Sequence, residues 1–227
     1  PFIALATLVH LVPRIRLGTS VIVLPQRNTF LVAKQAATLD LLSEGRLILG
    51  VGVGLRESQY KLLGADFAAR GVVLDEAIEV MQALWREPVS RYDGRFHRFD
   101  DVVLLPKPAQ PAGPPIWIGG DSPAALKRVA TYGRAWIPYI FDLERFRSGV
   151  ARLRELTDGR YCPMIGGYFN LRIKRSDEPA VVETKFPWAP ISIGGTPDQI
   201  AEGFEQFRMA GLEYAICLFE SESVDDY

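Results

Sequence analysis

The sequence is short of the residues on which several kinds of protein depend. Only two cysteines, Cys162 and Cys217, and two histidines, His10 and His97, occur among 227 residues. Two cysteines are too few for a disulfide framework, and with the histidines they show no spacing typical of a zinc site. We therefore expect no metal centre, and the low cysteine content favours a reducing, cytoplasmic location.

An excess of charge of one sign is also lacking. The 26 Lys and Arg residues and the 27 Asp and Glu residues nearly cancel, and no basic cluster stands out. Because nucleic acids and anionic membranes attract clustered positive charge, we expect neither as a partner. No apolar run reaches the ~20 residues that a membrane-spanning helix needs, and no signal-peptide pattern is visible. The common nucleotide, serine-hydrolase and zinc-protease motifs are missing as well.

Apolar residues, by contrast, are plentiful, at 48% of the chain. This content and the length predict one sizeable domain over residues 1–227. The chain opens at Pro1 inside an apolar helical pattern, and it ends at Asp226-Tyr227 in what resembles the start of a helix. We expect further elements on both sides.

Helical and extended patterns alternate along the chain. Helices are expected over 2–11, 29–42 (with Thr29 as N-cap), 75–85, 123–132, 143–156 and 197–209. Strands are expected over 15–24, 47–53, 116–118, 135–140, 164–173 and 214–219. The strands are apolar throughout, which is typical of a parallel sheet covered by helices. This pattern predicts an α/β fold, a TIM-type (β/α)8 barrel with two strands before Pro1; a doubly wound open sheet is the alternative.

Two segments interrupt this alternation and are interpreted as insertions, at about 86–115 and 174–190. The first contains Asp93-Gly94 between extended arms, which predicts a β-hairpin, followed by a stretch with five prolines. The second is charged and unpatterned. Such insertions are either lids or binding loops, or surface loops without a special role.

A glycine-rich strand end is the first candidate for a binding site. Gly50, Gly52 and Gly54 lie on one face of the predicted strand, because side chains alternate along a strand. Three absent side chains leave room for a flat ligand at the carboxyl end of the strand, where ligands of parallel α/β folds bind. A glycine-rich turn that only relieves packing is the alternative.

A second candidate is the turn Gly119-Gly120-Asp121-Ser122, which joins a strand to a helix. Ser122 suits the N-cap and Pro123 the first helical position. Glycines allow close approach to the backbone, and the N–H groups of a helix start attract phosphate. The alternative is an ordinary Ser-Pro cap. A similar turn precedes Thr196, where Thr196 and Gln199 would form a capping box, but loop-like sequence comes before it.

The remaining polar candidates leave the chemistry open. Thr19 and Ser20 bring hydroxyl groups into an apolar strand, and each needs a partner from the backbone or from a ligand. His10 is interpreted as a packed residue, and His97 has no carboxylate nearby in the sequence at triad-like spacing. No catalytic acid or base can be named.

Five motifs in order resemble the luciferase-like monooxygenase family, and within it the branch that uses the deazaflavin coenzyme F420. These motifs are Arg14–Val21, Ala37–Asp40 with Ser43–Arg46, Gly50–Gly54, Arg70-Gly71 with Asp75-Glu76, and Pro114–Gly120.

The resemblance implies a TIM-type barrel, usually a homodimer, with a flavin or deazaflavin across the carboxyl ends of the strands. The Ser20–Val21 peptide, next to Thr19, would lie behind the ring system, and in relatives this strand can carry a bulge with a cis peptide bond. Gly52 and Gly54 would flank the ring. The turn from Gly119 to Ser122 would hold the phosphate.

Three functions agree with this resemblance. The first is hydride transfer between coenzyme F420 and a small organic substrate. The second is an FMN-dependent monooxygenase, and the third is a non-catalytic flavin-binding or assembly barrel. Leu55 stands where some relatives have an acidic residue, so the resemblance does not identify the substrate.

Overall fold

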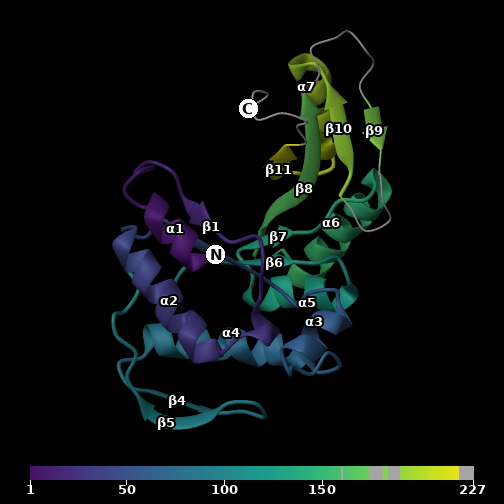
Figure 1. Cartoon of the computed structure of the whole chain (residues 1–227). Coiled ribbons are helices and arrows are strands. Elements are labelled where there is room, and N and C mark those ends of the chain that lie inside the picture. The colour runs from purple at the N-terminus through teal and green to yellow at the C-terminus, as the bar shows by residue number, and fades with distance from the viewer. Residues whose placement is uncertain (160, 174–180, 184–189, 220–227) are drawn as a thin grey trace. The chain divides into compact units, whose positions relative to one another are not determined.

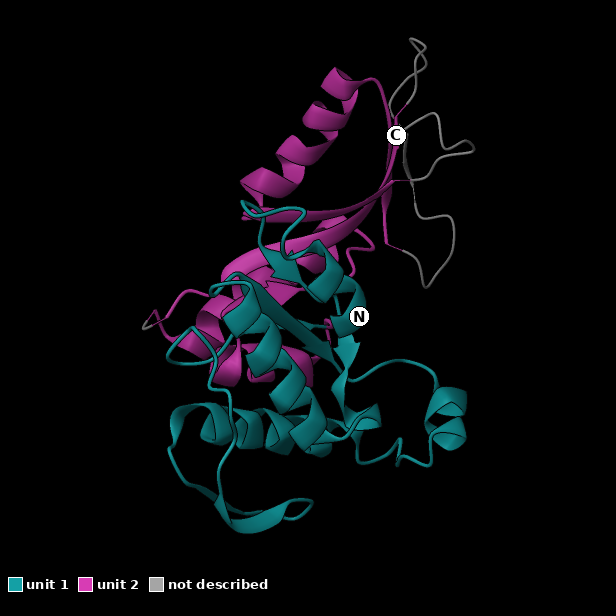
Figure 2. Cartoon of the chain, turned by 60° about the vertical axis from the view of Figure 1, so that its left-hand side comes forward, with its two compact units in different colours: residues 1–119 teal, residues 120–227 magenta. Residues whose placement is uncertain are grey.

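The computed structural model describes residues 1–159, 161–173, 181–183 and 190–219 (Figure 1). By its internal contacts the chain divides into two compact units, residues 1–119 and 120–227 (Figure 2). Within the described ranges, no helix combines the length and the apolar character needed to cross a membrane.

The first unit is built on short parallel strands. Strands β1 (Leu17–Gly18) and β2 (Ile22–Val23) both pair with β3 (Leu47–Gly52), and β6 (Ile116–Gly119) pairs with β3 from the other side. Its helices are α1 (Phe2–Leu8), the 3-10 turn η1 (Leu24–Gln26), α2 (Thr29–Leu42), α3 (Glu57–Leu62) and α4 (Arg70–Arg86). Every residue of β3 is buried, as expected for a strand in a helix-covered sheet.

Helix α4 shows why the core of this unit is stable. The predicted apolar face of the helix, formed by Leu74, Ile78, Met81 and Trp85, is at most 2% exposed. Burying each such side chain contributes about 1.5–3 kcal/mol. The Trp85 indole also donates a hydrogen bond of 3.0 Å to the Ala33 carbonyl oxygen, which ties α4 to α2.

Two expectations for the start of this unit are wrong in detail. The strand predicted over 15–24 is interrupted between β1 and β2, where the Ser20–Val21 peptide bond is cis. Helix α2 is capped by Asn28, not Thr29, since the Asn28 side chain accepts a hydrogen bond from the Leu31 N–H at 2.9 Å. Asn and Thr are both good N-caps, so the sequence alone does not decide between these adjacent residues.

The predicted hairpin within 86–115 is confirmed. Strands β4 (Ser90–Asp93) and β5 (Arg98–Val102) are antiparallel. The Gly94 N–H closes the turn on the His97 carbonyl oxygen at 2.9 Å. Contacts between β4 and α4 place the hairpin beside that helix (Figure 1).

The second unit has a parallel sheet with one antiparallel edge. Strand β8 (Met164–Ile173) pairs in parallel with β7 (Ala135–Ile137), β10 (Ser192–Gly195) and β11 (Tyr214–Phe219). The antiparallel edge is β9 (Val181–Glu183), which pairs with β10. The helices are α5 (Pro123–Tyr132), α6 (Leu143–Thr157) and α7 (Pro197–Met209). Phe204 and Phe207 of α7 pack on Phe169 with ring centroids 4.8 and 5.1 Å apart.

Strand β10 is an element that the sequence reasoning missed, because its four residues follow a loop-like segment. The capping box of α7 is present as predicted, with Thr196 and Gln199 each bonded to the other's backbone N–H. Of the insertion expected at 174–190, only β9 and residue 190 fall within the described residues.

Candidate functional site

The three glycines expected on one face of β3 are covered, and Gly54 is not part of the strand, which ends at Gly52; Gly54 has φ +68°. A Cβ atom at Gly50 would lie 1.9 Å from the Thr19 carbonyl oxygen. At Gly52 it would lie 2.9 Å from Val21 Cγ2, and at Gly54 it would lie 2.9 Å from Val23 Cγ1. The expectation that the absent side chains leave room for a flat ligand is therefore wrong. Segment 19–23, which precedes β3 in the chain, fills that space.

Thr19 explains how that segment is held. Its hydroxyl accepts a hydrogen bond from the Gly50 N–H and donates one to the Gly50 carbonyl oxygen, both at 2.9 Å. The residue is 5% exposed. The partner of this hydroxyl is thus the backbone of β3, the first of the two possibilities that the sequence left open.

The surface at this end of β3 is made by the residues that cover the glycines. Ser20 is exposed and Val21 is half-buried, whereas Gly50 and Gly52 are buried. The cis peptide bond that the resemblance implied is found between Ser20 and Val21. Ser20 and Val21, and not the glycines, therefore form the surface here. The glycines allow segment 19–23 to pack directly on β3.

The start of α5 has the predicted capping geometry. Ser122 Oγ accepts a hydrogen bond from the Ala125 N–H at 3.2 Å, and Pro123 is the first helical residue. Gly120 has φ +100°, a backbone conformation that favours glycine. Its carbonyl oxygen accepts a hydrogen bond of 2.7 Å from Trp136 Nε1, which fixes the turn against β7. Since Pro123 has no N–H and the Ala125 N–H is bonded to Ser122, these two residues offer no free donor at the start of α5.

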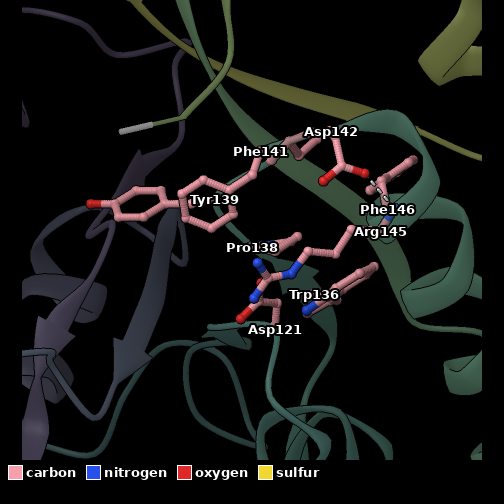
Figure 3. A pocket seen from close by; sticks show the side chains of 9 residues that line it. Asp121, Trp136, Pro138, Tyr139, Phe141, Asp142, Arg145 and Phe146 are labelled. Carbon is pink, nitrogen blue, oxygen red and sulfur yellow. Dashed lines mark hydrogen bonds and ion pairs between the residues drawn. The ribbon is translucent and has the colours of Figure 1, made fainter. Parts of the chain in front are cut away.

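A small cavity lies beside this turn (Figure 3). Its lining residues come from the turn, β7, the loop after it and the start of α6: Asp121, Trp136, Pro138, Tyr139, Ile140, Phe141, Asp142, Arg145 and Phe146. The volume of ≈ 10 Å³ accommodates about one water molecule. The space is too small for a flavin ring.

Charged side chains meet in this cavity. Arg145 Nη2 lies 2.6 Å from Asp121 Oδ2, and the guanidinium carbon lies 5.1 Å from the centre of the Phe141 ring. Asp142 is the N-cap of α6 and accepts a hydrogen bond of 2.7 Å from the Arg145 N–H. Sequence reasoning named Asp121 but missed Arg145, because no motif marks an arginine three residues into a helix.

The motif from Asp40 to Arg46 proves to be structural. Asp40 is fully buried and accepts hydrogen bonds from the backbone N–H and the side-chain amide of Gln110, at 2.9 and 2.8 Å. The Arg46 guanidinium donates to four carbonyl oxygens at 2.8–2.9 Å, those of Val9, Val12, Ile15 and Ser43. These contacts join α2 and β3 to neighbouring loops.

A histidine and a carboxylate are close in space although not in sequence. His97 Nδ1 lies 2.9 Å from Glu76 Oε1, and His97 Nε2 lies 2.8 Å from Thr29 Oγ1. The carboxylate partner of His97 therefore lies 21 residues away in the sequence, and folding brings the two side chains together. Thr29 is 4% exposed, and the contacts of His97 with Glu76 and Thr29 join the hairpin to α4 and α2.

Hydrogen bonds to Glu76 also set its protonation. Burial raises the pKa of this carboxyl group, but the hydrogen bonds from the His97 ring and from the backbone N–H groups of Arg95, Phe96 and His97 outweigh burial and lower it. Glu76 is therefore a carboxylate near neutral pH. It fixes the turn of the β4–β5 hairpin against α4.

The comparison with known families defines the class of protein. Residues 1–161 match the family described as luciferase-like monooxygenase. The chain belongs to this family of oxidoreductases. Among curated proteins, an uncharacterised protein of Mycobacterium bovis is 37% identical over 157 residues, which cover 68% of this chain and 54% of that protein. The chain thus spans about half the length of such curated relatives.

Solved structures establish the fold. An F420-dependent secondary alcohol dehydrogenase has a TM-score of 0.84 at 16% identity, over 99% of this chain and 79% of that one. The oxygenating constituent of 3,6-diketocamphane monooxygenase from Pseudomonas putida, solved with FMN, has a TM-score of 0.79 at 14% identity, over 100% and 78%. The fold is therefore that of the TIM-barrel luciferase-like enzymes, as predicted.

Proposed function

We propose that this chain binds a flavin-type cofactor and serves an oxidoreductase that transfers a hydride between coenzyme F420 and a small organic substrate. The observation that carries the proposal is membership of the luciferase-like family over a stretch that includes the turn at Gly119–Ser122. An F420-dependent alcohol dehydrogenase among the structural neighbours supports the deazaflavin. The neighbour solved with FMN supports the second candidate, an FMN-dependent monooxygenase.

The residues would have distinct roles in binding. In the second unit, Gly120, Asp121 and the Ser122 cap, preceded by Gly119, would receive the phosphate at the start of α5. In the first unit, Ser20 and Val21 would lie behind the ring. The cofactor supplies hydride transfer when bound, and the chain supplies orientation and keeps water out.

Gly50, Gly52 and Gly54 keep a place in this proposal, but an indirect one. They allow segment 19–23 to pack directly on β3, and Thr19 holds it there through the Gly50 backbone. We further propose a homodimer located in the cytoplasm, without nucleic-acid or membrane partners. The catalytic acid or base is not assigned to any residue.

Titration with each cofactor, followed by fluorescence, tests this proposal. We expect binding of coenzyme F420, with weaker binding of FMN. Tight FMN binding without deazaflavin binding would favour the monooxygenase. If neither cofactor binds, the non-catalytic alternative takes its place.

A pair of glycine variants locates the phosphate. Gly120→Ala adds a methyl group in the turn, where φ is +100°, and should weaken cofactor binding at least tenfold. Gly159→Ala is the matched control, since φ is +65° and no atom lies within 4 Å of its Cβ position. Gly159 lies in the left-handed α region and Gly120 beyond it, so thermal unfolding of both variants is measured alongside. Equal losses of affinity would place the phosphate elsewhere.

A further inference from the structure

We propose that one face of the sheet in the second unit binds the organic substrate and selects a substrate with an aromatic ring beside a carbonyl or hydroxyl oxygen. The residues that make these contacts are Tyr139, Asn170 and Ser192. This inference rests on the proposed function, because it names the substrate class of the proposed oxidoreductase. It makes the three side chains specificity-determining residues.

The face in question is the one that helix α7 leaves uncovered. Side chains alternate between the two faces along β8 and along β10. Phe169 of β8 faces α7, since its ring packs on two phenylalanine rings of that helix. Ile193 of β10 faces α7 as well, because a Cβ atom at Gly203 would lie 2.9 Å from Ile193 Cγ2. The adjacent residues Asn170 and Ser192 therefore lie on the opposite face.

Asn170 and Ser192 form a polar pair, because they are direct neighbours across β8 and β10. Ser192 is 5% exposed, and its buried hydroxyl has no hydrogen-bond partner in the described part of the chain. The Asn170 amide donates one hydrogen bond of 3.2 Å to the Pro190 carbonyl oxygen, and its second N–H and its oxygen remain for other partners. An unpaired buried hydroxyl is costly, so the pair is suited to a polar group of a ligand.

An aromatic ring lies beside this pair on the same face. Tyr139 follows β7 and forms a parallel bridge with Tyr168, two residues before Asn170 on β8. The rings of Tyr139 and Tyr168 are 5.0 Å apart at 77°, an edge-to-face contact. Residues two apart on a strand are separated by roughly 7 Å. One small molecule can therefore reach both the ring of Tyr139 and the polar pair.

Tyr139 is exposed although its backbone is fixed. The carbonyl oxygens of Pro138 and Ile140, on either side of it, accept hydrogen bonds from the Tyr168 and Ile191 N–H groups at 3.0 and 2.6 Å. Tyr139 is nonetheless 40% exposed, and its ring extends away from the ion pair drawn in Figure 3. A tyrosine ring offers a large contact area at a low cost in conformational entropy, and aromatic rings pack favourably on other rings.

The polar pair suits both oxidation states of such a substrate. A carbonyl oxygen only accepts hydrogen bonds, and the Ser192 hydroxyl and the Asn170 amide can both donate one. An alcohol also donates a hydrogen bond, which the Asn170 side-chain oxygen can accept. The same two residues can therefore bind an aromatic carbonyl compound and the alcohol into which hydride transfer converts it.

Three ligands of similar size separate the ring from the oxygen. Acetophenone has both, cyclohexyl methyl ketone has only the carbonyl oxygen, and ethylbenzene has only the ring. Their dissociation constants are measured by NMR on the full chain with saturating coenzyme F420. Tyr139→Leu should weaken acetophenone and ethylbenzene about fivefold and leave cyclohexyl methyl ketone unchanged. Phe96→Leu is the matched control, because Phe96 is 39% exposed and lies in the hairpin of the first unit.

Ser192→Ala tests the polar pair. It should weaken both ketones about fivefold and leave ethylbenzene unchanged. The thermal midpoint of the ligand-free chain should stay level or rise, because the hydroxyl that is removed has no partner there. A hydroxyl with a structural role would give the opposite result, a lower midpoint with unchanged ketone affinity.

Two results with the variants would overturn the proposal: equal losses for all three ligands in Tyr139→Leu, or ketone affinities that do not change in Ser192→Ala. A wild-type chain that binds coenzyme F420 but none of the three ligands would also overturn it and would leave the proposed function in place. If coenzyme F420 itself does not bind, the proposed function fails and this inference fails with it.

Discussion

At Gly50 a hydrogen atom is the only side chain that fits. Even a methyl group there would lie 1.9 Å from the Thr19 carbonyl oxygen, and backbone atoms cannot move aside cheaply. We predict that Gly50→Ala lowers the free energy of unfolding by roughly 3 kcal/mol, as overpacking of a core does. Urea unfolding measures the loss.

Gly18→Ala serves as the control for this prediction. The nearest atom to its Cβ position is Ile48 Cβ at 3.8 Å, an ordinary contact. We expect a change below about 1 kcal/mol. Losses of equal size for both glycines would contradict the close approach of Thr19 to β3.

Arg46 carries a second prediction at the scale of the residue. Arg46→Met would leave four carbonyl oxygens, previously bonded to one guanidinium, without their donor. We expect a loss of roughly 1–3 kcal/mol in unfolding free energy, because three of the four contacts are part-buried and lose a charged donor. Arg16→Met removes an exposed arginine and should have little effect; a comparable loss there would argue against the role of Arg46.

Sequence reasoning succeeds for residues whose partners are local. Ser122 caps α5 as predicted, because an N-cap is decided within three residues. It fails at Gly50, since the group that fills the space, Thr19, lies 31 residues earlier in the chain. Arg145 was missed for the same reason: its partner Asp121 belongs to another helix start.

The β4–β5 hairpin is an element that depends on one carboxylate. Glu76 accepts hydrogen bonds from three backbone N–H groups of the turn and from the His97 ring. Its pKa in the folded protein lies below the ordinary value of 4.5. The ionised group therefore stabilises the fold above about pH 4.5, and this contribution is lost as the pH falls through the lower folded-state pKa.

We predict that Glu76→Gln destabilises the protein at pH 7 and less so in acid. The difference in unfolding free energy between wild type and variant should shrink as the pH is lowered below about 4.5. Hydrogen exchange of the turn amides gives a local readout. Glu57→Gln, which alters an exposed pair with Lys61 on α3, is the control. A difference that stays constant from pH 7 to pH 3 would contradict the role of Glu76.

Regular elements were predictable where the apolar pattern is long. Helix α7 and strand β11 begin and end at the predicted residues, 197–209 and 214–219. Strand β10 has four residues, two of them glycine, and too little pattern to be recognised. The strand predicted over 15–24 is split into β1 and β2. The residues between them pack on the glycines of β3, and this packing is not visible in the apolar pattern of 15–24.

For the molecule as a whole, the family and the fold could be predicted because five weak motifs occur in order. The identity of the cofactor could not, because proteins that share this fold include both an F420-dependent enzyme and one solved with FMN. We predict that a saturating cofactor stabilises the chain against unfolding. At a hundredfold excess over the dissociation constant the gain is about 2.7 kcal/mol.

Thermal unfolding with and without ligand measures this gain. The midpoint should rise with coenzyme F420 concentration, and riboflavin at the same excess over its own dissociation constant should give the same stabilisation. A midpoint that stays fixed while fluorescence reports binding would mean that the ligand binds the unfolded chain equally well.

The Trp136 indole gives the protein an optical sensor of its own. Its N–H is bonded to Gly120, its ring stacks on Phe146, and it forms part of the wall that contains Arg145. Emission from an indole responds to its hydrogen bond and to nearby charge, so the difference spectrum between the wild-type chain and Trp136→Phe isolates this one environment. Events at the start of α5 can then be followed in real time without attaching any dye.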